Sequence, residues 1–315
     1  MTFFRQGCHS DIKLLPQYFI SYRLIIIYRY FFLKSVVFPV FYYLCAWTNS
    51  IQSAMQSRQL NRRQYFYELA TTSKKYFIPY IQRHKQVERG MKVLEIGCGD
   101  GGNLLPFSCM GCDVVGVDMA EGRIKDARKF FLENGAKGRF IASDVFLLEE
   151  LKHQFDLIVC HDVIEHIDDK EGFMCKCKQL LKQGGGIFMS FPAWQMPFGG
   201  HQQICRSRFL SHLPFFHLLP TSFYEWILRA WKEDKGCVSE LLNIKQTKCS
   251  IELFESTMRK EGFEAIDRTF YFINPHYEVK FHLRPRKLYA VIGAIPYIRN
   301  FFTTSCFYFL RPVGE

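Results

Sequence analysis

A short apolar run that leads directly into a glycine-rich turn most constrains the fold of this chain. Residues 93–102 read Val-Leu-Glu-Ile-Gly-Cys-Gly-Asp-Gly-Gly. The apolar run at 93–96 is typical of a central strand in a parallel sheet, which is buried on both faces. Glycines at 97, 99 and 101 then remove the Cβ atoms where the chain reverses into a helix. A ligand can therefore lie against the main chain of this turn.

The glycines alone leave the kind of ligand open. Gly97, Gly99 and Gly102 also satisfy the G-x-G-x-x-G spacing of dinucleotide-binding proteins, so an NAD(P)-dependent oxidoreductase remains an alternative. Glu95, two residues before the first glycine, would be poorly placed beside a pyrophosphate but well placed near an ammonium or sulfonium group. The pattern Glu-x-Gly-x-Gly-x-Gly resembles motif I of the class I S-adenosylmethionine-dependent methyltransferases.

Three later strands are expected to end in polar residues. The run 114–117 ends at Asp118, about twenty residues after the turn, where an acid can accept both ribose hydroxyls. The run 140–142 leads to Asp144, which the resemblance places against the adenine amino group. A fourth run, 155–160, continues into His161-Asp-Val-Ile-Glu-His. The residues predicted to bind the cofactor, S-adenosylmethionine, are Glu95, Gly97, Cys98, Gly99, Gly101, Asp118, Met119, Asp144, Val145 and His161.

Helical periodicity between these runs predicts an α/β fold. Ile124, Ala127 and Phe131 recur at helical spacing before Gly135, and apolar residues at 173–181 do so before the next glycines. Alternating strands and helices of this length indicate right-handed crossovers and a parallel sheet.

The end of the chain favours a methyltransferase sheet over a dinucleotide-binding one. Two runs, 264–273 and 277–283, are joined by Asn-Pro-His and predict an antiparallel hairpin at the sheet edge. The expected fold is a Rossmann-like, seven-stranded, mostly parallel sheet with helices on both faces, this terminal hairpin and a helical lid insertion. The predicted organisation is an apolar and basic segment at 1–54, a helical cover at 55–90, a methyltransferase domain at 91–285 with a lid at 192–250, and a basic aromatic tail at 286–315.

The resemblance is strongest for the branch that contains the ubiquinone-biosynthesis O-methyltransferases. Their fourth strand commonly ends in an acid-x-x-Glu-His sequence, like Asp162-Val-Ile-Glu165-His166 here. The Asn/Asp-Pro-Pro-aromatic motif of amino-methyltransferases that act on bases is missing, so a nucleic-acid substrate is not expected. The resemblance implies methyl transfer to a small, apolar or aromatic acceptor of lipid or quinone character, with O-methylation favoured. A non-catalytic cofactor-binding or membrane-associated module of the same fold is the alternative.

Two histidines are candidates for a catalytic base. A hydroxyl acceptor must lose its proton, and a positioned imidazole accelerates such a step by typically about 10²–10⁴-fold. His166 follows the fourth strand and His201 follows Pro-Phe-Gly-Gly, and a structural role is the alternative for each. No metal site is predicted from the residues themselves, although resemblance to metal-using quinone O-methyltransferases implies that Asp162, Glu165 and His166 could hold a divalent cation. A helix cap with a solvated acid would explain these three residues equally well.

Residues 192–250 are too many for an ordinary connection between two elements. They hold three of the four tryptophans and several phenylalanines, so disorder is not expected. We expect a lid over the strand ends, lined with aromatic side chains for a flat or apolar acceptor. A helical flap packed for its own stability is the alternative.

The net charge of +11 is unevenly distributed. Residues 1–54 contain five basic side chains and one acid, and 279–314 contain six basic side chains and no acid. Both ends are rich in aromatic residues, which favours contact with an anionic membrane surface over nucleic acid. The apolar runs at 24–47 are interrupted by charges and Pro39, so neither reaches the ~20 residues of a spanning helix. Translation from Met55 is an alternative explanation of the first segment.

The twelve cysteines lack the paired spacing of a zinc site, and Cys109-x-x-Cys112 is the only C-x-x-C pair. They are predicted to be small buried apolar residues in a reducing compartment. No small-x-small cleavage site follows the first apolar run. The expected location is therefore cytoplasmic, with contact to the inner face of the membrane as a further expectation.

Overall fold

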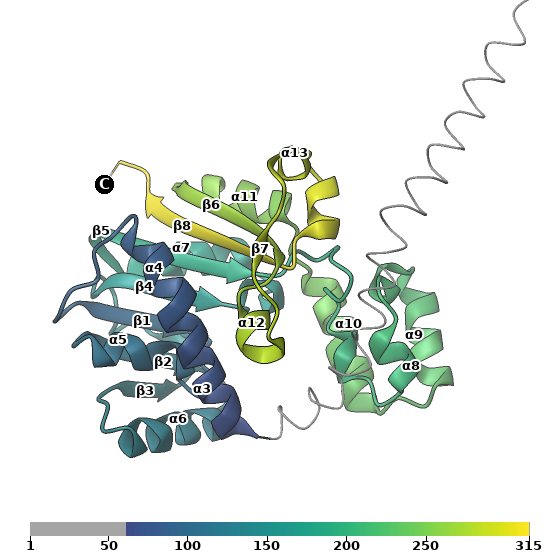
Figure 1. Ribbon diagram of the computed structural model, residues 1–315, viewed down its shortest axis with the longest axis horizontal. Coiled ribbons are helices and arrows are strands. Elements are labelled where there is room, and N and C mark those ends of the chain that lie inside the picture. Colours follow the sequence, from purple (N-terminus) through teal and green to yellow (C-terminus); the bar gives the residue numbers. More distant parts are fainter. Residues whose placement is uncertain (1–60, 315) are drawn as a thin grey trace, which may run out of the picture. The chain divides into compact units, whose positions relative to one another are not determined.

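The computed structural model describes residues 61–314 (Figure 1). The predictions made for residues 1–54, for the apolar runs at 24–47 and for a start at Met55 lie outside these described residues. Among residues 61–314, no helix combines the length and the apolar character needed to cross a bilayer.

The described residues form one sheet with strand order β3-β2-β1-β4-β5-β8-β6-β7. Strands β1 to β5 are parallel, whereas β8 pairs antiparallel with both β5 and β6. The predicted Rossmann-like α/β fold is thus confirmed, with eight strands in the described part instead of seven. The strands are β1 (Lys92–Ile96), β2 (Asp113–Asp118), β3 (Arg139–Ala142), β4 (Phe155–His161), β5 (Leu181–Phe191), β6 (Phe263–Ile273), the two-residue β7 (Arg286–Lys287) and β8 (Ser305–Pro312).

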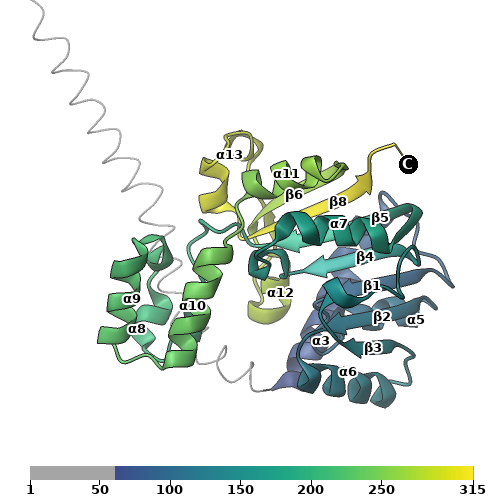
Figure 2. The same ribbon diagram turned by 180° about the vertical axis from the view of Figure 1, so that it is seen from behind.

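Helices cover both faces of the sheet (Figures 1 and 2). One face carries α3 (Arg62–Thr72), α4 (Ile78–Gln82), α5 (Leu105–Cys109) and α6 (Glu121–Glu133). The other carries α7 (Lys170–Leu180) and α11 (Ile251–Lys260). A π-helical turn at Ser73–Phe77 joins α3 to α4.

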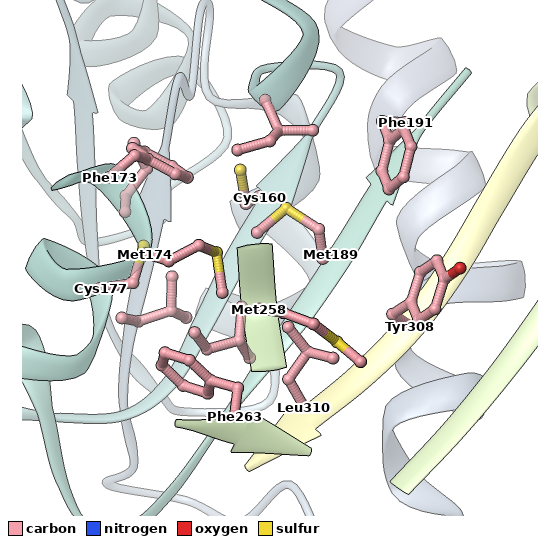
Figure 3. Packing of buried hydrophobic residues seen from close by; sticks show 14 of the residues in the cluster. Cys160, Phe173, Met174, Cys177, Met189, Phe191, Met258, Phe263, Tyr308 and Leu310 are labelled. Atoms are coloured by element: carbon pink, nitrogen blue, oxygen red, sulfur yellow. The ribbon is translucent and has the colours of Figure 1, made fainter. Parts of the chain in front are cut away.

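The core under α7 and α11 ties distant parts of the chain together (Figure 3). Met174 and Cys177 of α7 are buried in one cluster with Met258 of α11 and with Met189 and Leu310 of β5 and β8. Full burial of such a side chain stabilises the fold by roughly 1.5–3 kcal/mol. Strand β8, near the chain end, is therefore part of the core.

The predicted terminal hairpin is wrong in its second half. The run 264–273 lies in β6, but residues 277–283 largely form helix α12 (His276–Phe281). The side chain of Asn274 accepts the His276 N–H at 2.9 Å, and Pro275 precedes the helix with its φ already at −52°. These starting signals outweigh the alternating apolar pattern of the segment. The long antiparallel partner of β6 is β8.

The prediction of a basic aromatic tail at 286–315 is also wrong where β8 lies between β5 and β6. Arg311 donates a 2.6 Å hydrogen bond from Nη2 to the carbonyl oxygen of His84. Arg299, 5% exposed, pairs with Glu252 at 2.9 Å and with Glu255 at 3.0 Å. These two arginines therefore make contacts within the protein's own fold.

Between β5 and α11 the chain forms a helical insertion with its own small core, as the length and composition of 192–250 predicted. Tyr224 and Leu228 of α9 are fully buried there, with Leu241 of α10. Phe209 and Trp226 are each 60% exposed. The helices are η6 (Gln202–Ile204), α8 (Arg208–His212), η7 (Phe216–Leu218), α9 (Thr221–Ala230) and α10 (Lys235–Thr247).

Candidate cofactor and active site

The glycine turn after β1 leaves no room for side chains. Gly97 has φ +71°, and a Cβ there would lie 2.3 Å from Cγ2 of Val163. Gly101 has φ +83°, a conformation that L side chains rarely adopt. Glycine is needed at position 102 for a different reason: a Cβ added there would lie 2.4 Å from the carbonyl oxygen of Phe66 in α3. The glycine that completes the dinucleotide spacing is therefore explained by close packing of a helix.

Asp118, at the carboxyl end of β2, is held by two backbone N–H groups. Gly99 donates to its Oδ2 at 2.9 Å and Ala120 donates to its Oδ1 at 2.8 Å. These bonds fix the carboxylate beside the turn after β1, and each oxygen keeps a lone pair for a further donor. The predicted ribose-binding residue is thus oriented at the turn before any ligand arrives.

Glu95 is buried at the carboxyl end of β1, directly before the turn. Asn103 Nδ2 donates to its Oε1 at 2.7 Å, whereas Oε2 has no hydrogen-bond partner in the described part of the chain. Burial raises the pKa of this carboxyl group to about 8, and the charge of Asp118 contributes in the same direction. Asn103 was not predicted, although its place in the helical turn η3 (Gly102–Leu104) follows the glycines.

The other residues predicted to bind the cofactor differ in burial and in the contacts of their side chains. Cys98 and Val145 are buried in the two cores, so only their main chain can meet a cofactor. Met119 is 77% exposed. Asp144 accepts the Phe146 N–H at 3.0 Å and so begins the short helix η4 (Val145–Leu147). Arg123 was not predicted, but a Cβ on Gly99 would lie 3.1 Å from its Nη1.

His161 is the last residue of β4 and is held through both ring nitrogens. Its Nδ1 lies 3.2 Å from Oγ of Ser190, and its Nε2 lies 3.4 Å from Oδ2 of Asp162. The ring also contacts Phe77, with centroids 4.9 Å apart. Asp162 follows with φ +54°, which is uncommon outside glycine. The chain therefore turns sharply at this strand end.

The two predicted bases, His166 and His201, lie together. Their ring centroids are 5.0 Å apart, although one follows β4 and the other begins the insertion. Their ring nitrogens and a carboxylate oxygen of Glu165 all lie within 4.8 Å of one another. Two of the three residues considered for a metal ion, Glu165 and His166, are thus in this group together with His201.

Charge and burial set unusual titration behaviour in this group. Both carboxylate oxygens of Glu165 are buried and have no hydrogen-bond partner among residues 61–314. Burial raises the pKa of Glu165 well above its usual range, with a further contribution from Asp162. Burial lowers the pKa of His201 to about 4, helped by the neighbouring His166 and His217. The ring of His201 is therefore neutral at pH 7.

Two tyrosines from distant helices lie near the strand end of β4. Burial raises the pKa of Tyr277 in α12 to about 12, and the negative charge of Asp162 adds to this. The pKa of Tyr65 in α3 is raised by the same two causes. His276 Nδ1 lies 2.9 Å from Thr72 Oγ1 and so ties α12 to α3. Sequence reasoning missed both tyrosines, because no local pattern brings these helices together.

Comparison with known proteins bears on the same strands. Residues 94–189 match the family described as methyltransferase domain. A ubiquinone biosynthesis O-methyltransferase of Bordetella avium is 35% identical over 114 residues, which cover 36% of this chain and 47% of that relative. The enzyme of the same name from Sinorhizobium medicae is 27% identical over 193 residues, covering 61% and 68%. The chain spans about half the length of the first of these relatives.

A solved structure with a similar arrangement is the TehB-like SAM-dependent methyltransferase of Corynebacterium glutamicum, which is 14% identical with a TM-score of 0.46 and covers 82% of this chain and 98% of that one. The family match covers β1 to β5, the glycine turn and the strand-end acids described above. Residues 94–189 are therefore similar to a methyltransferase domain, and the relatives that the chain matches are named as methyltransferases.

Proposed function

We propose that this protein transfers the methyl group of S-adenosylmethionine to an oxygen atom of a small, apolar or aromatic acceptor. Binding of the cofactor in this proposal is supported by the glycine turn after β1 and by the two acids beside it. Oε2 of Glu95 is buried and lacks a partner among the described residues, so a cationic group of the cofactor fits there. Asp118, already oriented by Gly99 and Ala120, suits the ribose.

The short distance between the rings of His166 and His201 is the single observation that supports oxygen as the methylated atom. The sulfonium supplies an electrophilic methyl group, and in-line orientation of the acceptor can account for ~7–11 kcal/mol of the barrier. A hydroxyl must also lose its proton. His166 is exposed and accepts that proton, while the neutral, half-buried ring of His201 orients the acceptor. The relatives named ubiquinone biosynthesis O-methyltransferases favour the same acceptor atom.

A divalent cation fits the same group of side chains. Glu165 offers two buried oxygens that have no other partner in the described chain, and His166 and His201 offer neutral nitrogens beside them. When bound, such an ion lowers the pKa of a coordinated hydroxyl group. These three residues would hold it, and a chelator that abolishes turnover without weakening cofactor binding would support this mode.

We also propose that the acceptor is reached at a membrane surface through the helical insertion. Phe209 stacks on Trp231 with centroids 6.2 Å apart, and Phe223 stacks on Trp226 at 5.6 Å. All four rings are exposed, and basic side chains lie near them in sequence. Exposed aromatic and basic side chains together suit the boundary of an anionic bilayer.

Liposome flotation tests the membrane contact. The doubly substituted Phe223→Ser/Trp226→Ser protein should bind anionic vesicles more weakly than the unaltered chain, by at least about tenfold. Leu132→Ser provides the control, because Leu132 is an apolar residue that is even more exposed but lies on α6. Equal flotation of all three proteins would contradict a role for the insertion.

The enzymatic proposal is tested by incubating the full chain with labelled S-adenosylmethionine and lipid extracts, followed by mass spectrometry of the product. A methyl ether in an apolar product is expected. A methylated amine or carbon would contradict oxygen as the acceptor atom. Tight cofactor binding without transfer in any extract would instead support the non-catalytic alternative.

A further inference from the structure

A second cluster of metal-ligating side chains lies inside the helical insertion. Cys205 follows η6, and Glu233 and Cys237 lie at the start of α10. One carboxylate oxygen and the two sulfur atoms all lie within 4.8 Å of one another. Cys205 is fully buried, and the other two side chains are each 8% exposed. None of these residues belongs to the group around His166.

The cluster sits in an otherwise apolar core and includes a fourth polar group. The side chain of Tyr224 is fully buried, and its hydroxyl has no hydrogen-bond partner in the described part of the chain. Tyr224 is buried in the same cluster of side chains as Cys205 and Cys237. A buried hydroxyl without a partner costs about 1–3 kcal/mol. A core built only for packing would hold an apolar ring at this position.

We infer that Cys205, Glu233 and Cys237 bind one divalent ion of the zinc class. Zinc takes thiolate and carboxylate ligands at ~2.0–2.3 Å in tetrahedral geometry, which places neighbouring ligand atoms roughly 3.5–4 Å apart. The present separations fall within reach of that arrangement. Water or the hydroxyl of Tyr224 completes the coordination, and the orphaned hydroxyl then gains a partner.

The carboxylate of Glu233 is already oriented for this role. The backbone N–H groups of Arg206 and Ser207 donate to its two oxygens at 2.8 and 2.9 Å. Each oxygen keeps a lone pair, so the ion can be bound without loss of these bonds. The same two N–H groups directly follow Cys205, which fixes the first sulfur atom relative to the carboxylate.

Binding has a defined proton balance and a structural consequence. Both thiols must lose a proton when they become ligands, so two protons are released for each ion and no oxidant is needed. The ion connects the segment before α8 with the start of α10, and α8 and α9 lie between them. Its binding free energy therefore adds to the stability of the insertion.

Cobalt replacement tests this inference in the full chain. Thiolate-to-cobalt charge-transfer absorption should appear with one equivalent of Co²⁺ and disappear on addition of Zn²⁺. Cys205→Ala and Cys237→Ala should abolish it, and Glu233→Gln should weaken Zn²⁺ binding at least about tenfold. The group around His166 contains no cysteine, so this absorption does not report on it or on methyl transfer.

The matched control is Cys177→Ala, because Cys177 is equally buried but lies in α7. This variant should keep the cobalt absorption. A chelator should lower the thermal midpoint of the unaltered chain but not that of Glu233→Gln, and this readout holds even if a cysteine variant does not fold. Absence of the absorption, with both thiols freely titratable in the presence of Zn²⁺, would overturn the inference, as would a disulfide between them.

Discussion

The cofactor side and the acceptor side of the site are built in opposite ways. On the cofactor side, Asp118 and Asp144 accept backbone N–H groups a few residues away or from the adjacent turn. On the acceptor side, both oxygens of Glu165 lack a partner among residues 61–314, and His201 arrives from the insertion. Local backbone can orient a carboxylate on its own, whereas the second group forms only when the insertion is docked.

Docking of the insertion depends on a few hydrogen bonds at its ends. The hydroxyl of Thr247 donates to the carbonyl oxygen of Glu165 at 2.7 Å, and Lys170 Nζ donates to the carbonyl oxygen of Thr247. The Trp194 N–H donates to the carbonyl oxygen of Cys249 at 2.9 Å. The two ends of the insertion are thus tied together next to Glu165.

Removal of an imidazole side chain should have the largest effect, because it should lower the rate of methyl transfer without weakening cofactor binding. His166→Ala should lower the methyl-transfer rate by about 10²–10⁴-fold, because a positioned base contributes that much. His201→Ala should also lower the rate, because the acceptor loses the ring that orients it. The dissociation constant for S-adenosylmethionine should change by less than about twofold. His212→Ala, on α8, is the control. A normal rate in both variants would show that the paired rings are structural.

The two sides should also respond to pH in opposite directions. His217, fully buried in the insertion, has its pKa lowered to about 4, so the unfolded state binds more protons between pH 4 and 6.5. Its contribution to stability is therefore lost as the pH falls. The pKa of Glu95 is raised to about 8, so the folded state binds more protons between pH 4.5 and 8. The contribution of Glu95 to the stability of the folded protein is therefore lost as the pH rises.

Thermal unfolding measured as a function of pH tests both of these contributions to stability. His217→Gln keeps a donor to the carbonyl oxygen of Trp194 and should remove the loss of stability at acid pH. Glu95→Gln keeps the contact with Asn103 and should remove the loss of stability at alkaline pH. Each effect is on the order of 3–5 kcal/mol across its range. Unchanged curves in both variants would show that these groups titrate as they do in the unfolded chain.

A smaller effect is expected from replacing Asp118, the acid proposed to bind the ribose. Asp118→Ala should weaken S-adenosylmethionine binding about 10–100-fold, because a hydrogen bond to a charged group contributes ~1.5–3 kcal/mol. Calorimetry measures this directly. Asp113→Ala, at the opposite end of β2, should bind normally. Equal affinity of the folded Asp118 variant and the unaltered protein would refute the assignment.

The smallest expected effect is the release of a proton when S-adenosylmethionine binds. At pH 7 the carboxyl group of Glu95 is largely protonated, and a cationic group of the cofactor placed beside it would lower its pKa. Binding should therefore release up to about one proton, seen by calorimetry in buffers with different ionisation enthalpies. Glu95→Gln should release none. Release that persists in this variant would point to another group.

Local pattern was sufficient for the first half of the domain. The apolar runs that became β1 to β5, the glycine turn and the acids after β2 and β3 each depend on neighbouring residues. Patterns of this kind are visible without knowledge of the fold, because periodicity and turn chemistry act over a few residues. Both candidate histidines and Glu165 were found in the same way, but not their arrangement.

The amino-acid sequence by itself thus determined the strands and helices from β1 to β5, the glycine turn after β1 and the types of side chain at the strand ends. Only the tertiary structure decided that His201 meets His166, that Asn103 holds Glu95 and that β8 separates β5 from β6. Strand partners and contacts across an insertion are selected by the packing of residues far apart in the chain. Such packing leaves no periodic or local mark that a single sequence can reveal.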